Sequence, residues 1–271
     1  MCRLLNLSRS GFYAWLRKPS SARSTQNEGL IREIRRIYAE GRGEYGSPTI
    51  CASLRQEGYG VNHKRVARLM RQLGLRSKVV PRFKRTTRRC ADRDAAPNLL
   101  RQNFHTEGPN RVWLSDITYI GTDEGWLYLT TVEDMWSRRM VGHAITDHLR
   151  ATAVLDALEM ALGRRCVTPG LIFHSDRGMQ YADHRVRQIF TARGMIQSMS
   201  STGNCYDNAM AESFFATFKK GHVFWERFRT KEQARRRIFE YLEVFYNRVR
   251  RHSSLGYKSP VAFEHQHMIL A

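Results

Sequence analysis

The feature that most restricts the fold is the order of strand-like and helix-like segments after residue 110. Three strand-like segments come first, at residues 112–120, 126–132 and 138–145. Helix-like and strand-like segments then alternate, at residues 149–162, 170–175, 183–193 and 196–200. A glycine-bounded turn at 121–125 joins the first two strands as a hairpin. This order predicts an α/β fold with a mixed five-stranded sheet flanked by helices.

The first third of the chain has a different pattern, made of short helices only. Residues 1–5 and 9–16 predict two short helices, which form either a helix-turn-helix-like fragment or a docking arm. Three further helices are predicted at 27–39, at 48–57 and from Asn62 to Leu73. A small all-α region therefore precedes the sheet.

The last of these helices is basic on its outward face. The cations that we expect there to bind DNA are Lys64, Arg65, Arg68 and Arg71. A trihelical unit with a basic final helix fits a DNA-binding module, although a solvated basic helix has the same pattern. The basic stretch that follows is either a linker that contacts phosphates or a soluble tether.

The charge supports a polyanionic partner. The 271 residues hold 45 Lys and Arg against 25 Asp and Glu, a net charge of +20. Residues 1–100 carry 22 − 7 = +15 of it, and residues 101–271 carry 23 − 18 = +5. Nucleic acid is the partner that such an excess favours. The first third is thus expected to face nucleic acid, while the rest of the chain retains many acidic residues.

Several other classes of protein do not fit. No apolar run is long enough to span a bilayer, and no signal peptide follows the N-terminus, so we expect an intracellular protein without a membrane partner. The five cysteines form no C-x-x-C pair, and the histidines have no metal-binding spacing. We therefore expect neither disulfides nor a zinc site.

Three carboxylates stand out by their positions. Asp116 lies inside an otherwise apolar strand, Asp176 directly follows the fourth strand, and Glu212 lies on a predicted helix. Three converging acids repel one another, and Mg²⁺ or Mn²⁺, which prefer oxygen ligands, would relieve that repulsion. Two such ions about 3.5–4 Å apart can stabilise an in-line phosphoryl displacement. Spacing alone leaves the alternative open that the three acids are separate structural residues.

The residues around these acids resemble the catalytic subunit of bacterial insertion-sequence transposases, relatives of retroviral integrases. The matching segments are WLSDITYI at 113–120, HSDRGMQY at 174–181, STGNCYDNAMAESFF at 201–215 and YNRVRRHSSLGY at 246–257. YGSP at 45–48, RVARLM at 65–70 and Ser259-Pro260 extend the resemblance over nearly the whole chain. There are 35 residues between Asp176 and Glu212, a hallmark spacing of the group, and 59 between Asp116 and Asp176.

The resemblance implies a ribonuclease-H-like core with the catalytic acids Asp116, Asp176 and Glu212. These would bind two divalent ions, Mg²⁺ or Mn²⁺, for attack by water and then by a DNA 3′-hydroxyl on phosphodiester bonds. No covalent protein–DNA intermediate is expected. The implied partner is double-stranded DNA, at the element ends and the target, bound by a homo-oligomer. The group also implies an upstream-frame partner protein and a bacterial, cytoplasmic, nucleoid-associated location.

Neighbouring polar residues have expected roles of their own. Asn208 either contacts DNA, as a polar residue does at this place in related integrases, or caps the helix. Lys219, seven residues after Glu212 and on the same helical face, is expected to contact phosphate, and Lys220 is a further candidate. His174 is expected to pack behind the site rather than bind metal, and Asp134 to be structural.

The resemblance and the residue patterns together predict five regions. These are a helical arm at 1–25, a trihelical DNA-binding region at 26–80, a basic linker at 81–108, an integrase-like catalytic core at 109–225, and a C-terminal helix and tail at 226–271. The expected function is a DNA transposase. The alternatives are a non-catalytic DNA-binding regulator and a ribonuclease-H-like nuclease.

Overall fold

The computed structural model describes residues 2, 7–17, 22–79, 96–201 and 205–269. The chain forms two compact units, Met1–Arg76 and Ser77–Ala271. The predicted helix at 1–5 and most of the predicted basic linker lie outside the described residues. The five predicted regions divide the chain more finely than the two units do, and their boundaries stay predictions.

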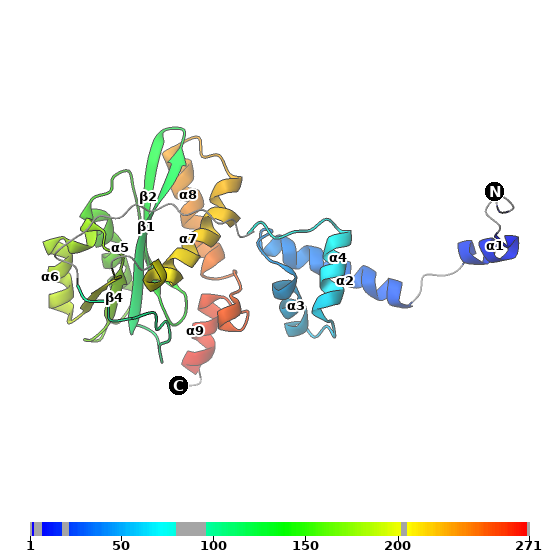
Figure 1. The fold of residues 1–271 in the computed structure, drawn as a ribbon, viewed down its shortest axis with the longest axis horizontal. Coiled ribbons are helices and arrows are strands. Elements are labelled where there is room, and N and C mark those ends of the chain that lie inside the picture. The colour runs from blue at the N-terminus through cyan, green and yellow to red at the C-terminus, as the bar shows by residue number, and fades with distance from the viewer. Residues whose placement is uncertain (1, 3–6, 18–21, 80–95, 202–204, 270–271) are drawn as a thin grey trace. The chain divides into compact units, whose positions relative to one another are not determined.

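The first unit is helical, as its sequence predicts (Figure 1). Its helices are α1 Arg9–Arg17, α2 Ala22–Glu40, α3 Ser47–Gln56 and α4 His63–Gln72. Apolar residues of α2, α3 and α4 form one core, which includes the fully buried Ile34, Leu54 and Val66. Asn62 caps α4, because its Oδ1 accepts a hydrogen bond from the Arg65 N–H at 2.8 Å. Three helices thus share one small hydrophobic core.

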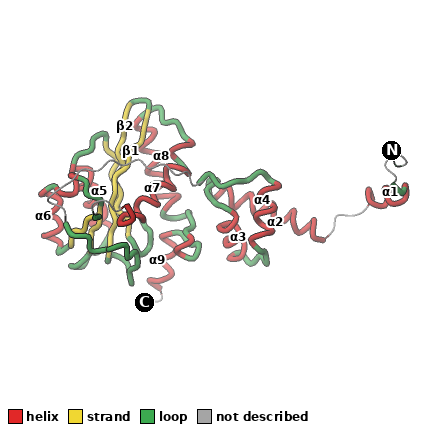
Figure 2. Tube along the Cα trace, viewed as in Figure 1, coloured by secondary structure: helices red, strands yellow, loops and turns green. Residues whose placement is uncertain are grey.

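The second unit is built on one mixed sheet (Figure 2). Its strands are β1 Val112–Thr122, β2 Gly125–Asp134, β3 Met140–Thr146, β4 Ile172–Ser175 and β5 Ile196–Met199. They lie in the order β3-β2-β1-β4-β5, with β1, β2 and β3 antiparallel and β4 and β5 parallel to β1. This arrangement confirms the predicted ribonuclease-H-like sheet.

Helices cover both faces of the sheet (Figure 1). One face packs against α5 Ala151–Arg164 and α6 His184–Arg193. The approach of α5 to β3 is close enough that a Cβ on Gly142 would lie 2.1 Å from the Ala157 carbonyl oxygen. The other face packs against α7 Ala209–Gly221 and α8 Lys231–Glu240 through an aromatic core. Side chains alternate between the two faces along each strand.

The C-terminal part differs most from the prediction. The C-terminal helix predicted within residues 226–271 is α8, which ends at Glu240 and passes into a π-helical segment, η4 Tyr241–Tyr246. A further helix, α9 Pro260–Ile269, occupies what was predicted as a tail. Pro260 at its first position is a helix-start signal that the sequence interpretation did not use. The helix predicted at 149–162 is α5, which begins at Ala151 and ends at Arg164.

Four short 3-10 segments complete the described structure. They are η1 Met179–Ala182, η2 Cys205–Asn208, η3 Val223–Trp225 and η5 Ser253–Leu255.

In the described part of the chain, no helix combines the length and apolar character needed to cross a membrane.

Candidate active site

Asp116 lies in the central strand, on the face that packs against α7. Its neighbours on that face, Leu114 and Ile120, are fully buried. Asp116 itself is half-buried, and its Oδ1 accepts a hydrogen bond from the Ile117 N–H at 2.8 Å. A carboxylate in this position is costly unless it pairs or binds a cation.

Asp176 lies beside Asp116 because of the strand register. Ser115 of β1 pairs with Ser175 of β4 in parallel, so the next residue of each strand is an aspartate. Neighbouring strands lie about 4.7–4.9 Å apart. The Asp176 Oδ1 accepts a hydrogen bond from the Gly178 N–H at 3.0 Å, which fixes the start of the following loop. Two carboxylates with 59 residues between them in the chain therefore meet on the neighbouring strands β1 and β4.

Glu212 reaches the same region from α7. This helix packs against β1 through Met210, Ala211 and neighbouring apolar residues, while Glu212 is exposed in its first turn. Lys219 lies two turns later on the same side of the helix and is half-buried. Both side chains act electrostatically on Asp116, Glu212 raising and Lys219 lowering its pKa.

The electrostatics of the site follow from burial and like charges. Burial, and then repulsion by Asp176 and Glu212, raises the pKa of Asp116 from 3.8 to about 8. The protein packed around Asp176 also raises the pKa of that carboxyl, although the residue is exposed. Burial lowers the pKa of Lys219, and the nearby Asp116 opposes this shift. In the absence of a cation, Asp116 therefore keeps its proton at neutral pH.

The side chains of Asp116, Asp176 and Glu212 have the ligand chemistry that a hard divalent cation requires, but they do not form a ready-made metal site among the described residues. Among the described residues, no group of three or more His, Cys, Asp or Glu side chains is arranged to hold a metal ion. All three side chains offer only oxygen ligands, which Mg²⁺ and Mn²⁺ prefer.

Asn208 and Lys220 lie at the two ends of α7. Asn208 holds the N-cap position, but its side chain makes no capping hydrogen bond. It is 4% exposed, and its Oδ1 has no hydrogen-bond partner among the described residues. The capping role considered for it is therefore wrong. Lys220 is half-buried in the last turn, where its carbonyl oxygen accepts a 2.6 Å hydrogen bond from Trp225 Nε1.

His174 packs behind the acidic pair. It is fully buried, with Nδ1 2.9 Å from Ser198 Oγ and Nε2 3.3 Å from Ser200 Oγ. Burial lowers the pKa of His174 to about 4, which keeps the ring neutral. It supports β4 and β5 next to Asp176, which agrees with its expected packing role.

Asp134 is structural, as expected. Its carboxylate accepts backbone hydrogen bonds from Asn110 at 2.7 Å, Trp136 at 3.0 Å and Ser137 at 3.2 Å. These bonds hold the turn that leads from β2 to β3. Asp134 is fully buried at the end of β2.

The sequence interpretation did not identify the buried polar residues that pack behind Asp116 and Asp176. The Tyr181 hydroxyl lies 3.0 Å from Ser115 Oγ, and both residues are fully buried. Burial, together with the charges of Asp176 and Asp116, raises the pKa of Tyr181 well above its usual value. Ser198 and Ser200 were missed as well, although their spacing of two in a strand places them on one face.

In the first unit, the predicted basic residues divide into two kinds. Lys64, Arg68 and Arg71 are exposed on α4. Arg65 is half-buried and donates from Nε and Nη2 to the Asn27 Oδ1 on α2, at 3.0 and 2.8 Å. The structure therefore does not place Arg65 freely on the outward face with the other three.

Comparison with known families gives three matches along the chain. A model described as an HTH-like domain matches residues 25–83. Two models of an integrase core domain match residues 106–205 and 193–260. Together the two integrase matches cover the sheet, α7, α8 and the π-helical segment.

Two relatives match the chain over nearly its full length. An uncharacterized 31 kDa protein of insertion element IS600 from Shigella sonnei is 41% identical over 100% of both chains. The transposase InsF for insertion sequence IS3A of Escherichia coli K12 is 39% identical over 99% of this chain and 94% of its own.

Solved structures of viral integrases are also similar. A chain of the simian T-cell lymphotropic virus intasome in complex with PP2A regulatory subunit B56 gamma gives a TM-score of 0.48 at 13% identity, over 82% of this chain and 71% of its own. The HTLV-2 integrase catalytic core domain in complex with magnesium gives 0.45 at 12% identity, over 59% of this chain and 100% of its own.

Proposed function

Because the chain belongs to the family of insertion-sequence transposases with an HTH-like domain and an integrase core, we propose that Asp116, Asp176 and Glu212 are its catalytic residues. The observation that supports this assignment is the raised pKa of Asp116, which results from burial and from the charges of the other two acids. Carboxylates with such perturbed pKa values gather at functional sites.

Asp116, Asp176 and Glu212 would hold two Mg²⁺ or Mn²⁺ ions. When bound, such ions stabilise the attacking and leaving oxygens of an in-line phosphoryl displacement. The role of the three side chains is to supply anionic oxygen ligands from a rigid sheet and a helix packed on it. His174 and Tyr181 keep the ends of β4 and β1 in place behind them.

The reaction would have two displacements at phosphorus. In the first, the oxygen of water bonds to phosphorus, and the P–O bond to the 3′-oxygen breaks and leaves a 3′-hydroxyl on the element end. In the second, this hydroxyl loses its proton, its oxygen bonds to a target phosphorus, and the former 3′-oxygen of the target leaves as a hydroxyl. No protein side chain becomes covalently attached.

The remaining polar side chains would position DNA. Lys219, held near Asp116, would contact a phosphate, and Lys220 would add a second cation at the end of α7. The amide oxygen of Asn208, which has no hydrogen-bond partner among the described residues, would accept a hydrogen bond from DNA. Lys64, Arg68 and Arg71 of α4 would bind DNA in the first unit.

The partners would be double-stranded element ends and target DNA. Joining two ends to one target requires more than one active site, so we expect a homo-oligomer on DNA, together with an upstream-frame partner protein. The place of action would be the bacterial nucleoid, in the cytoplasm.

The test is a cleavage and joining assay with element-end DNA and Mg²⁺. We expect Asp116→Asn, Asp176→Asn and Glu212→Gln each to lower both activities by roughly 100-fold or more, as loss of a group that stabilises transition-state charge does. The control is Asp156→Asn, which changes an exposed acid on α5 and should leave both activities unchanged.

Two outcomes would contradict the proposal. Unchanged activity in the three variants would mean that the acids are not catalytic and would favour a DNA-binding regulator. Cleavage without any joined product in the wild type would indicate a nuclease.

A further inference from the structure

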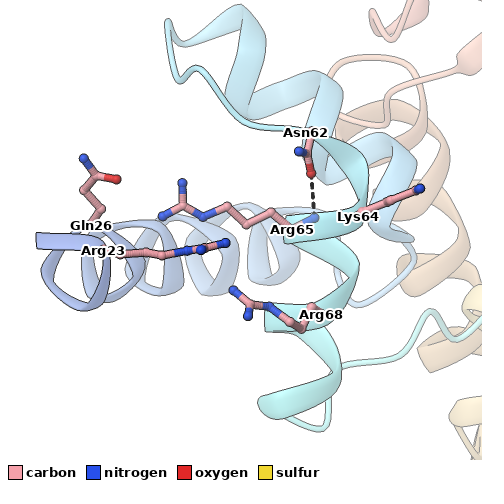
Figure 3. A pocket seen from close by; sticks show the side chains of 6 residues that line it. All are labelled: Arg23, Gln26, Asn62, Lys64, Arg65 and Arg68. Carbon is pink, nitrogen blue, oxygen red and sulfur yellow. Dashed lines mark hydrogen bonds between the residues drawn. The ribbon is translucent and has the colours of Figure 1, made fainter. Parts of the chain in front are cut away.

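A groove in the first unit lies between the start of α2 and the helix α4 (Figure 3). It has a volume of about 610 Å³, and its lining residues are Arg23, Gln26, Asn62, Lys64, Arg65 and Arg68. Two of these, Arg23 and Gln26, belong to α2, none of whose residues was among the predicted DNA contacts. The groove is therefore formed by two helices and lined by four cations.

Among the described residues, the cations of this groove have no acidic partner. The side chains of Arg23, Lys64 and Arg68 are exposed and make no ion pair or hydrogen bond with the residues that the structure describes. Figure 3 shows the guanidinium groups of Arg23 and Arg68 directed into the space between the helices, whereas Lys64 extends from the other side of α4. Like charges that share one cavity repel, and a bound anion relieves that repulsion.

Elsewhere in the same unit an arginine is fully compensated. Arg36 of α2 forms ion pairs with Glu33 at 2.7 Å, Glu40 at 2.7 Å and Glu57 at 2.5 Å. Arg23 and Arg68 have no such partners among the described residues.

Arg65 lines the groove but is already engaged. Its Nε and Nη2 both donate to Asn27 Oδ1, at 3.0 and 2.8 Å, and this contact joins α4 to α2. A guanidinium held in this way fixes the width of the groove, and fewer of its donors remain for a ligand.

We propose that this groove binds the phosphate backbone of duplex DNA through Arg23 and Arg68, with Lys64 at its rim, and that Arg65 is a positioning residue held by Asn27. The inference deepens the proposed DNA binding of this unit and rests on it. It adds the first turns of α2 to the interface and takes Arg65 out of the set of direct contacts. Because guanidinium groups bind phosphate without reading bases, binding at this groove is independent of DNA sequence.

The experiment measures binding of the full-length chain to a labelled random-sequence DNA duplex over a series of salt concentrations, with a chelator present. The slope of log Kobs against log salt is negative, and each lost phosphate contact makes it shallower by about 0.9. We expect this change in Arg23→Ala and in Arg68→Ala. The control is Arg32→Ala, because Arg32 is an exposed arginine of α2 that does not line the groove. Equal slopes in wild type and both groove variants, or an equal loss in Arg32→Ala, would overturn the proposal.

A second comparison tests Arg65. If it positions the groove, Asn27→Ala, Arg65→Ala and Arg65→Lys weaken binding to a similar extent and keep the wild-type slope, since each breaks the α2–α4 contact. If instead Arg65 binds phosphate, only Arg65→Ala makes the slope of log Kobs against log salt shallower by about 0.9, and Arg65→Lys binds like wild type. Urea unfolding of each variant shows whether the unit is still folded.

Failure of this inference and failure of the proposed catalysis give different results. Asp116→Asn, measured in the same binding assay, should bind DNA like wild type, because its loss concerns chemistry and not the groove. Conversely, unchanged salt slopes in Arg23→Ala and Arg68→Ala would overturn only the groove inference. The cleavage and joining assays of the acidic variants would still test the proposed catalysis.

Discussion

At the scale of single residues, Asp116 shows how one polar position in an apolar strand acquires its properties. The sheet register brings Asp176 beside it, and the packing of α7 brings Glu212 near it. Burial and these charges together raise its pKa to about 8. An isolated aspartate on a strand surface would experience neither effect.

This pKa predicts a pH-dependent stability. Folded, metal-free protein keeps the Asp116 proton up to about pH 8, whereas an unfolded aspartate ionises near its pKa of 3.8. Between these values only the unfolded state loses the proton, so the wild-type free energy of unfolding falls as pH rises and levels off above the folded pKa. Asp116→Asn cannot ionise. Its stability advantage over wild type should therefore grow between these pH values and then stay constant.

The measurement is urea unfolding of both proteins with a chelator, from acidic to mildly alkaline pH. The comparison with the variant is needed because burial also raises the pKa of Glu133 to about 8. A difference in unfolding free energy that is the same at every pH would show that Asp116 has an ordinary pKa.

The roles of these residues were predictable to different degrees. Asp116, Asp176 and Glu212 could be selected from the sequence because the motifs around them resemble those of insertion-sequence transposases, whereas their positions alone left a structural role open. The contact between Tyr181 and Ser115 could not, since it depends on which strands are neighbours. The engagement of Arg65 by Asn27 depends likewise on how α2 crosses α4.

At the scale of elements, α9 is the clearest departure from the sequence interpretation. It is fixed by Glu264, which is buried and receives hydrogen bonds from Arg165 at 2.5 Å, Arg139 at 2.6 Å and Ser137 Oγ at 2.7 Å. These donors come from the end of α5 and the turn before β3. Such long-range partners are invisible to local periodicity, so the sequence signals α9 only through Pro260, which was not used.

We expect Glu264→Gln to destabilise the second unit by about 3 kcal/mol, because it leaves buried cations without their partner. Arg165 is 8% exposed at its side chain, so water cannot replace the lost carboxylate there. The measurement is the urea unfolding midpoint at neutral pH. Glu159→Gln, an exposed change on α5, should be within about 0.5 kcal/mol of wild type. A Glu264 variant as stable as this control would mean that α9 is not held by the ion pairs.

At the scale of the whole molecule, the net positive charge and the three candidate catalytic acids lie in different parts of the chain. Most of the net charge of +20 lies before residue 101, whereas the three acids lie in the second unit. The α/β class, the mixed five-stranded sheet and the helical first unit could be predicted, since they depend on local pattern and chain order. The π-helical segment could not, because tertiary contacts decide it, and α9 had only Pro260 as a local signal.

The central claim is that Asp116 is a metal ligand in DNA joining, and the most direct measurement is the metal preference of Asp116→Cys. A thiolate is a poor ligand for Mg²⁺ and a better one for softer ions. The account predicts that this variant joins element-end DNA to a target with Mn²⁺ but not with Mg²⁺, whereas wild type uses both. Joining at the wild-type rate by Asp116→Cys with Mg²⁺ would contradict it.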